Sequence, residues 1–223
     1  LMMLQIRNSI RVCSAILLGA LSCACSRHED IWTDSYIEAY HEINGFYFRQ
    51  SGTSRFNFIG SGRSASIKST GEDKVWFDWI CYENGDFTYG REVRLMYGMP
   101  GTRAYTPDIV SIDVYSMDDF DSAHPAGSSL NDCITFEFES AKDFIESGYA
   151  DAGSLAIQKK LLSELTPEDL KILLWGFCYL DFKVKPEKLV IHTMKIVMKM
   201  SDGKEYTDTF KYSFSAGHLS ESK

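Results

Sequence analysis

The sequence predicts a mainly β fold: an antiparallel sandwich of two sheets with one short helical insertion. Apolar and polar side chains alternate with a period of two in several segments, and turn residues separate these segments. Apolar residues at helical spacing occur in one stretch, residues 155–176. The chain has 223 residues, of which 44% are hydrophobic, and this is enough to build one such domain.

Each expected strand places one face against a core and the other in water. In chain order, the expected strands are residues 43–49, 55–59, 75–82, 93–97, 110–114, 134–138, 178–184, 194–200 and 206–214. The segments 98–108 and 115–131 are rich in Gly, Pro, Asp and Ser, which predicts loops. About seven short strands at such spacing are typical of an immunoglobulin-like sandwich.

Two hairpins are expected from their turn residues. Asp202-Gly203 separates the two most regular strands, and Asn84-Gly85 follows the aromatic run 75–82. Both dipeptides supply the positive φ angle that a tight turn needs. Apolar residues occupy both faces of the aromatic run, which predicts a strand that is covered on both sides or has one face against something other than water.

One region favours helix over strand. Residues 155–165 carry apolar side chains at helical spacing, and Thr166-Pro167 is typical of a helix N-cap followed by proline. Gly176 is a suitable stop signal. One or two short helices are expected between these points.

The first thirty residues predict a targeting signal. Arg7 and Arg11 precede an apolar run over residues 15–21, which is too short for the roughly 20 residues of a membrane-spanning helix. A small residue stands before Cys23 and again before Cys25, which resembles the lipobox of bacterial lipoproteins. Lipidation is expected at Cys25, with Cys23 as the alternative.

The expected domain organisation follows from this signal. Residues 1–24 are a lipoprotein signal peptide, 25–35 a tether, 36–216 the β-sandwich domain and 217–223 a C-terminal tail. Acyl chains on the cysteine would anchor the protein in the bacterial cell envelope, at the outer membrane, either in the periplasm or exposed on the surface.

Charge and cysteine content exclude some partners. The chain carries 31 Asp and Glu against 23 Lys and Arg, a net charge of -8, and has no basic run, which argues against nucleic acid as a partner. Cys81, Cys133 and Cys178 lie in apolar or strand-like contexts, so buried free thiols are expected, although one disulfide is an alternative.

Three segments resemble an uncharacterised family of Bacteroidetes lipoproteins with immunoglobulin-like sandwiches. They are Ile43-Asn44-Gly45, the central Asp119-Phe120 with residues 125–132, and the final hairpin from His192 to Lys204. The resemblance implies the fold and the envelope location. It implies no activity, because the family has none assigned.

No catalytic constellation or cofactor motif stands out. Residues 60–65 fit G-x-G-x-x-A, but no helical pattern follows to meet a pyrophosphate. A loop containing Asp119, Asp121 and His124 is a weak candidate for a metal. Paired carboxylates, which need to meet only in space, or a metal at this loop would support the alternative function, an envelope hydrolase.

Aromatic residues are the remaining candidates for binding. Trp76 and Trp79 have opposite parity on the expected strand, which would place them on opposite faces. One of these two tryptophans could therefore be exposed. Tyr97 and Tyr105 flank a loop and could lie beside the exposed tryptophan, forming a surface that stacks on sugar rings or on a protein. The leading prediction is therefore a non-enzymatic envelope lipoprotein that acts as a binding or structural module.

Overall fold

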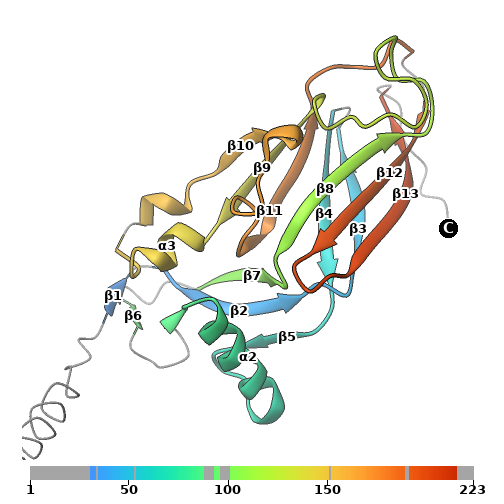
Figure 1. Ribbon diagram of the computed structural model, residues 1–223. Coiled ribbons are helices and arrows are strands. Elements are labelled where there is room, and N and C mark those ends of the chain that lie inside the picture. Colours follow the sequence, from blue (N-terminus) through green and yellow to red (C-terminus); the bar gives the residue numbers. More distant parts are fainter. Residues whose placement is uncertain are drawn as a thin grey trace, which may run out of the picture. The chain divides into compact units, whose positions relative to one another are not determined.

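The computed structural model describes residues 31–33, 35–52, 54–87, 93–95, 101–150, 152–188 and 191–214. The predicted mainly β fold is confirmed: within these residues an eight-stranded and a three-stranded sheet share a core. Figure 1 shows β8, β12 and β13 of the smaller sheet beside β3 and β4 of the larger one. The larger sheet consists of β2 (Ile37–Glu42), β3 (Gly45–Ser51), β4 (Arg55–Ser61), β5 (Ser64–Ser66), β7 (Thr102–Thr106), β9 (Ile134–Ser140), β10 (Gln158–Leu161) and β11 (Leu173–Phe182). The smaller sheet consists of β8 (Ile109–Ser116), β12 (Ile191–Met200) and β13 (Glu205–Ser213).

The predicted C-terminal hairpin is confirmed in the smaller sheet. β12 and β13 pair antiparallel up to Lys199 and Glu205, and Gly203 adopts a φ of 86° in the turn between them. β8 pairs with the other edge of β12. Met194, Ile196 and Met198 are all fully buried, which is the one-sided burial that their alternation predicts.

The two sheets are held together by aromatic side chains. Phe182 of β11 lies with its ring centroid 5.7 Å from Phe56 of β4, 5.1 Å from Tyr212 of β13 and 4.9 Å from Phe214. Burying each such side chain contributes about 1.5–3 kcal/mol. This contact joins the larger sheet to the smaller one.

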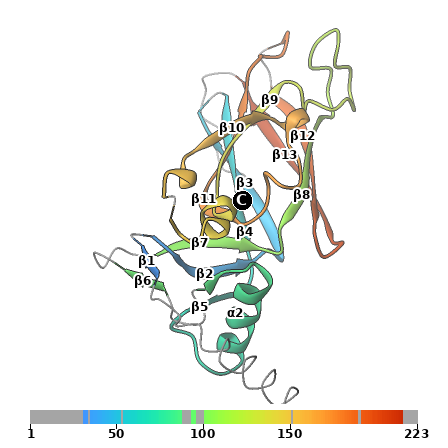
Figure 2. The ribbon, with the colours of Figure 1, turned by 60° about the vertical axis from the view of Figure 1, so that its left-hand side comes forward.

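The opposite face of the larger sheet carries a second core. Here α2 (Gly71–Glu83) and α3 (Lys142–Glu146) supply the cover, and Figure 2 shows α2 lying beneath β2 and β5. Tyr40 of β2, Phe77 of α2 and Phe144 of α3 are fully buried in this cluster. None of the described helices is long and apolar enough to span a membrane.

Two strand pairs depart from the antiparallel arrangement. β2 pairs in parallel with β7, and the short β1 (Ile31–Thr33) pairs in parallel with β6 (Val93–Leu95). A parallel pair needs a long crossover connection, and the segment containing α2 supplies it. The prediction of a loop over residues 98–108 is wrong for residues 102–106, which form β7.

The aromatic run 75–82 is a helix, which corrects the predicted strand and its hairpin. Phe77, Ile80 and Cys81 are the buried residues of α2, and they have helical spacing. Gly85 has a φ of 64° and donates its N–H to the Tyr82 carbonyl, while Asp86 donates to the Cys81 carbonyl. These two bonds form a Schellman cap, so Asn84-Gly85 ends a helix instead of turning a hairpin.

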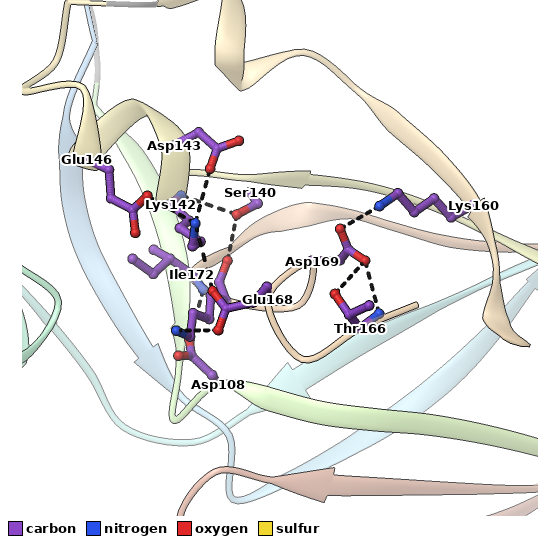
Figure 3. A network of polar contacts seen from close by, with 11 residues as sticks. Asp108, Ser140, Lys142, Asp143, Glu146, Lys160, Thr166, Glu168, Asp169 and Ile172 are labelled. Carbon is purple, nitrogen blue, oxygen red and sulfur yellow. Dashed lines mark hydrogen bonds and ion pairs between the residues drawn. The ribbon is translucent and has the colours of Figure 1, made fainter. Parts of the chain in front are cut away.

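The predicted helical stretch 155–176 is also corrected. A short 3-10 helix, η2 (Ala152–Leu155), ends where the stretch begins. The stretch itself contains strand β10, the 3-10 helix η3 (Leu162–Glu164), a turn and the first part of β11. The start signal forms locally, since Asp169 accepts hydrogen bonds from the Thr166 N–H and hydroxyl (Figure 3). The helix does not continue, because the residues from Leu173 onward pair with β9 and β7.

An ion network crosses the larger sheet on the side away from the sandwich core. Arg55 of β4 donates to both oxygens of Asp181 of β11, at 2.8–3.1 Å, and to Glu137 of β9 at 2.8 Å. Burial raises the pKa of Asp181, but the hydrogen bonds and charge of Arg55 outweigh this and hold that pKa below its ordinary value. The charged form of Asp181 therefore stabilises the fold.

We predict that Asp181→Asn lowers the free energy of unfolding at pH 7 by about 1–2 kcal/mol, allowing for the partial exposure of Arg55. A carboxyl whose pKa is lowered by folding stabilises the protein above its unfolded pKa of about 3.9 and loses that contribution as the pH falls further. The variant should therefore lose less stability than the parent between pH 5 and pH 2 in urea denaturation. Asp143→Asn, which changes an exposed ion pair, is the control. If the Asp181→Asn variant and the parent lost the same free energy of unfolding between pH 5 and pH 2, the assignment would be contradicted.

Candidate functional site

An open groove lies along α2, and the two predicted tryptophans both line it. The groove has a volume of about 580 Å³ and is lined by Arg63, Gly71, Glu72, Val75, Trp76 and Trp79. The side chains of Trp79 and Val75 are 57% and 70% exposed. The prediction that Trp76 and Trp79 point to opposite faces is wrong, because residues three apart in a helix lie on the same side.

Arg63 forms the polar wall of this groove. It follows β4 and lies with its guanidinium carbon 4.9 Å from the centroid of the Trp76 ring, within range of a cation–π contact. Two of its nitrogens donate to one oxygen of Asp73 at 2.8 and 2.6 Å. The guanidinium is therefore held in place beside the indole, and Glu72 supplies a second charged group.

A buried carboxylate fixes the position of α2. Asp86, directly after the helix, is fully buried and accepts hydrogen bonds from the hydroxyl groups of Tyr40, at 2.9 Å, and Tyr149. The Cys81 thiol lies 3.6 Å from the same carboxylate. Burial and the charge of Asp86 raise the pKa of Tyr40 well above its ordinary value, so the hydroxyl stays protonated as a donor.

The other predicted binding residues do not join the groove. Tyr105 is 2% exposed; its ring lies 6.1 Å from that of Phe58 and its hydroxyl accepts the Gly60 N–H at 3.2 Å. It is a core residue, which corrects the prediction. Tyr97 lies outside the described residues.

Trp175 is a further exposed tryptophan, which the sequence placed in the predicted helical stretch 155–176 and not on a strand. It lies on β11 with 41% of its surface exposed and stacks on His41 at 5.7 Å. His41 follows Tyr40 on β2, and successive side chains of a strand point to opposite faces. Because Tyr40 faces α2, Trp175 lies on the other face of the sheet from the groove.

The loop between β8 and β9 contains the weak metal candidates. Asp119 accepts the Ala126 N–H at 2.9 Å, so it serves the loop backbone. Asp121 accepts a hydrogen bond from the His124 ring at 2.7 Å. Within the described part of the chain, one group of His, Cys, Asp and Glu side chains could hold a metal: His124 with Asp132 and Cys133.

The three predicted buried cysteines are confirmed as free thiols: Cys81, Cys133 and Cys178. Burial and the charge of Asp132 raise the pKa of Cys133 to about 12. At neutral pH this thiol is protonated, which makes it a poor nucleophile. The predicted lipidation sites, Cys25 and Cys23, lie outside the described residues.

The G-x-G-x-x-A motif has a structural explanation. Gly60 and Ser61 belong to β4, and the chain passes through Gly62 into β5 without a helix. A Cβ atom at Gly62 would lie 2.0 Å from the carbonyl oxygen of Glu42. The backbone therefore approaches β2 too closely for any side chain, which explains this glycine without a ligand. The motif ends within strand β5, and α2 begins only at Gly71.

A charged cleft near the turn before β11 bears on the hydrolase alternative. It has a volume of about 210 Å³ and is lined by Glu83, Asn84, Asp108, Lys142, Glu146, Lys171 and Ile172. Burial raises the pKa of Asp108, but its carboxylate accepts the Ile172 N–H at 2.8 Å (Figure 3). Lys142 lies 3.0 Å from Glu146 and 3.8 Å from Glu168. Asp108 and Lys142 thus contact the turn before β11, through Ile172 and Glu168.

Comparison with known proteins adds no further guidance. No protein-family description, no curated protein and no solved structure matches the chain.

We predict that Tyr40→Phe destabilises the protein by about 1.5–3 kcal/mol, because it removes a hydrogen bond to a buried carboxylate. Tyr82→Phe removes the same atom from a side chain of α2 that is 69% exposed and should have no effect within about 0.5 kcal/mol. Urea denaturation midpoints followed by circular dichroism measure both changes. Equal midpoints for the two variants would show that Asp86 does not depend on the Tyr40 hydroxyl.

Proposed function

We propose that this protein is a non-enzymatic envelope lipoprotein whose domain binds a neutral glycan in the groove along α2. The observation that carries the proposal is that two indoles and a held guanidinium line one open groove. Sugar rings present apolar C–H faces with hydroxyl groups around the edge. A flat indole matches the face, and charged groups on the groove wall match the hydroxyls.

The size of the groove supports a small ligand. A volume of about 580 Å³ lies inside the range of roughly 300–1,000 Å³ for ligand sites. Trp79 and Val75 remain exposed in the free protein, so a ligand would remove apolar surface from water. Most of the contact area would come from side chains of α2, since Gly71, Glu72, Val75, Trp76 and Trp79 line the groove.

The charges around the groove favour a neutral ligand. Glu72 lines the groove, and Asp73 and Asp78 belong to the same helix. Arg63 is paired with Asp73, and Lys74 is paired with Asp78. An anionic ligand would meet this acidic helix without a free cation among these groups, whereas a neutral sugar pays no such electrostatic cost.

We predict that Trp79→Ala weakens glycan binding by about tenfold or more, equivalent to about 1.4 kcal/mol, because it removes the more exposed stacking surface. Neutral oligosaccharides found on a glycan array would be titrated into the full chain by calorimetry. Trp175→Ala, which removes an exposed tryptophan from the other sheet face, is the matched control and should leave the affinity unchanged. Binding of peptides alone, or equal affinities for the parent and Trp79→Ala, would contradict the proposal.

The envelope location has a separate test. We predict that labelled fatty acid is incorporated into the full chain expressed in a bacterial host and that Cys25→Ala abolishes the labelling, because the thiol carries the acyl group. Cys23→Ala should retain the label. The reverse pattern would assign the lipid to Cys23, and an unlabelled parent would contradict lipidation altogether.

A further inference from the structure

The loop between β8 and β9 brings one nitrogen, one sulfur and one oxygen ligand atom together. His124, Asp132 and Cys133 each offer such an atom, and these atoms lie within 4.8 Å of one another. The three residues are eight or nine positions apart or adjacent in the chain, so the fold of the loop creates the cluster. It lies outside the groove along α2.

The separations between the atoms match those of a tetrahedral metal site. Nε2 of His124 is 3.7 Å from Sγ of Cys133 and 3.3 Å from a carboxylate oxygen of Asp132. Around a tetrahedral zinc ion, with bonds of about 2.0–2.1 Å to nitrogen and oxygen and about 2.3 Å to sulfur, the corresponding separations are about 3.6 and 3.3 Å. These two separations are close to those around a bound ion, and the Cys133 sulfur lies within 4.8 Å of the Asp132 ligand atom.

The histidine ring is held by Asp121 through one of its nitrogens. Nδ1 of His124 lies 2.7 Å from Oδ1 of Asp121, and the same oxygen accepts the N–H groups of Ala123 and His124 at 2.9 Å. When Nδ1 carries the proton and donates it to Asp121, Nε2 is the ring nitrogen with a lone pair for a metal. The Cys133 sulfur lies 3.7 Å from Nε2 and 4.0 Å from Nδ1. A carboxylate that orients the histidine in this way is the common second layer of zinc sites.

The site has a buried ligand, Cys133, and an exposed one, Asp132. Cys133, directly before β9, is 5% exposed. Its N–H donates to the Leu130 carbonyl, and its carbonyl accepts the Lys183 N–H. The side chain of His124 is 15% exposed and that of Asp132 is 63% exposed. An ion can reach the cluster from the Asp132 side, where water can complete the coordination.

We propose that His124, Asp132 and Cys133 bind a zinc ion, with a water molecule as the fourth ligand. The mixture of imidazole, thiolate and carboxylate suits Zn²⁺, whereas Ca²⁺ and Mg²⁺ are bound by oxygen atoms alone. Cys133 binds as the thiolate, so its proton passes to solvent as the sulfur–zinc bond forms. No oxidation or reduction takes place.

The test uses the full chain, stripped of metal and titrated with Zn²⁺ and, separately, with Co²⁺. The parent should bind Zn²⁺ saturably, and the Co²⁺ form should show the absorption band of a thiolate bound to cobalt. Cys133→Ser should abolish this band and the saturable binding. Asp121→Asn should weaken zinc binding by about 10–100-fold, because it removes the group that orients the histidine.

The matched control changes a carboxylate of the same loop. Asp119→Asn retains the oxygen that accepts the Ala126 N–H and should bind zinc like the parent, whereas Asp132→Asn should bind it more weakly. Thermal unfolding of each metal-free variant shows whether it is folded. The proposal is overturned if the folded Cys133→Ser variant binds Co²⁺ with the parent's thiolate band, since another thiol would then be the ligand, or if the parent does not bind Zn²⁺.

Discussion

The aromatic contact between the two sheets is the interaction on which the rest of the structure depends. The ring of Phe182 lies 5.1 Å from Tyr212 and 4.9 Å from Phe214 across the interface, and each ring buries about 150–250 Å². Without this contact, the smaller sheet would expose a continuous apolar face to water. The loop with His124 is connected to this contact by Phe120, whose ring lies 6.0 Å from that of Phe182.

The central strand β11 connects this interior to the second core. Leu173 is buried between the sheets, whereas Leu174 is buried beneath the helices. The pairing with β9 shifts between Leu173 and Cys178, and Gly176 adopts a φ of 94° within this interval. Leu173 and Leu174 reach the two cores by ordinary strand alternation. The bulge changes which alternate positions face the sandwich core: Leu173 does so before it, and Cys178 and Leu180 do so after it.

Both candidate sites follow the same physical principle: an accessible group is held by buried neighbours. The exposed Trp79 belongs to a helix that is fixed by Phe77 and by the buried Asp86. In the other site, Asp121 orients His124, and the buried Cys133 forms the floor. Such support limits the conformational freedom that a ligand would otherwise have to remove.

The sequence by itself determined the one-sided strands, such as β12 and β13, because a period of two appears wherever one face meets water and the other a core. It also identified Trp76, Trp79 and His124 by residue type. Only the tertiary structure decided that residues 75–82 form a helix. The local signals were ambiguous, because aromatic residues have only a weak preference for strands and Asn84-Gly85 suits a hairpin turn and a helix cap equally. The helix forms because its apolar side chains cover a face of the larger sheet. The contact between His124 and Cys133 likewise depends on the conformation of the loop, and the spacing of the two residues in the sequence does not predict it.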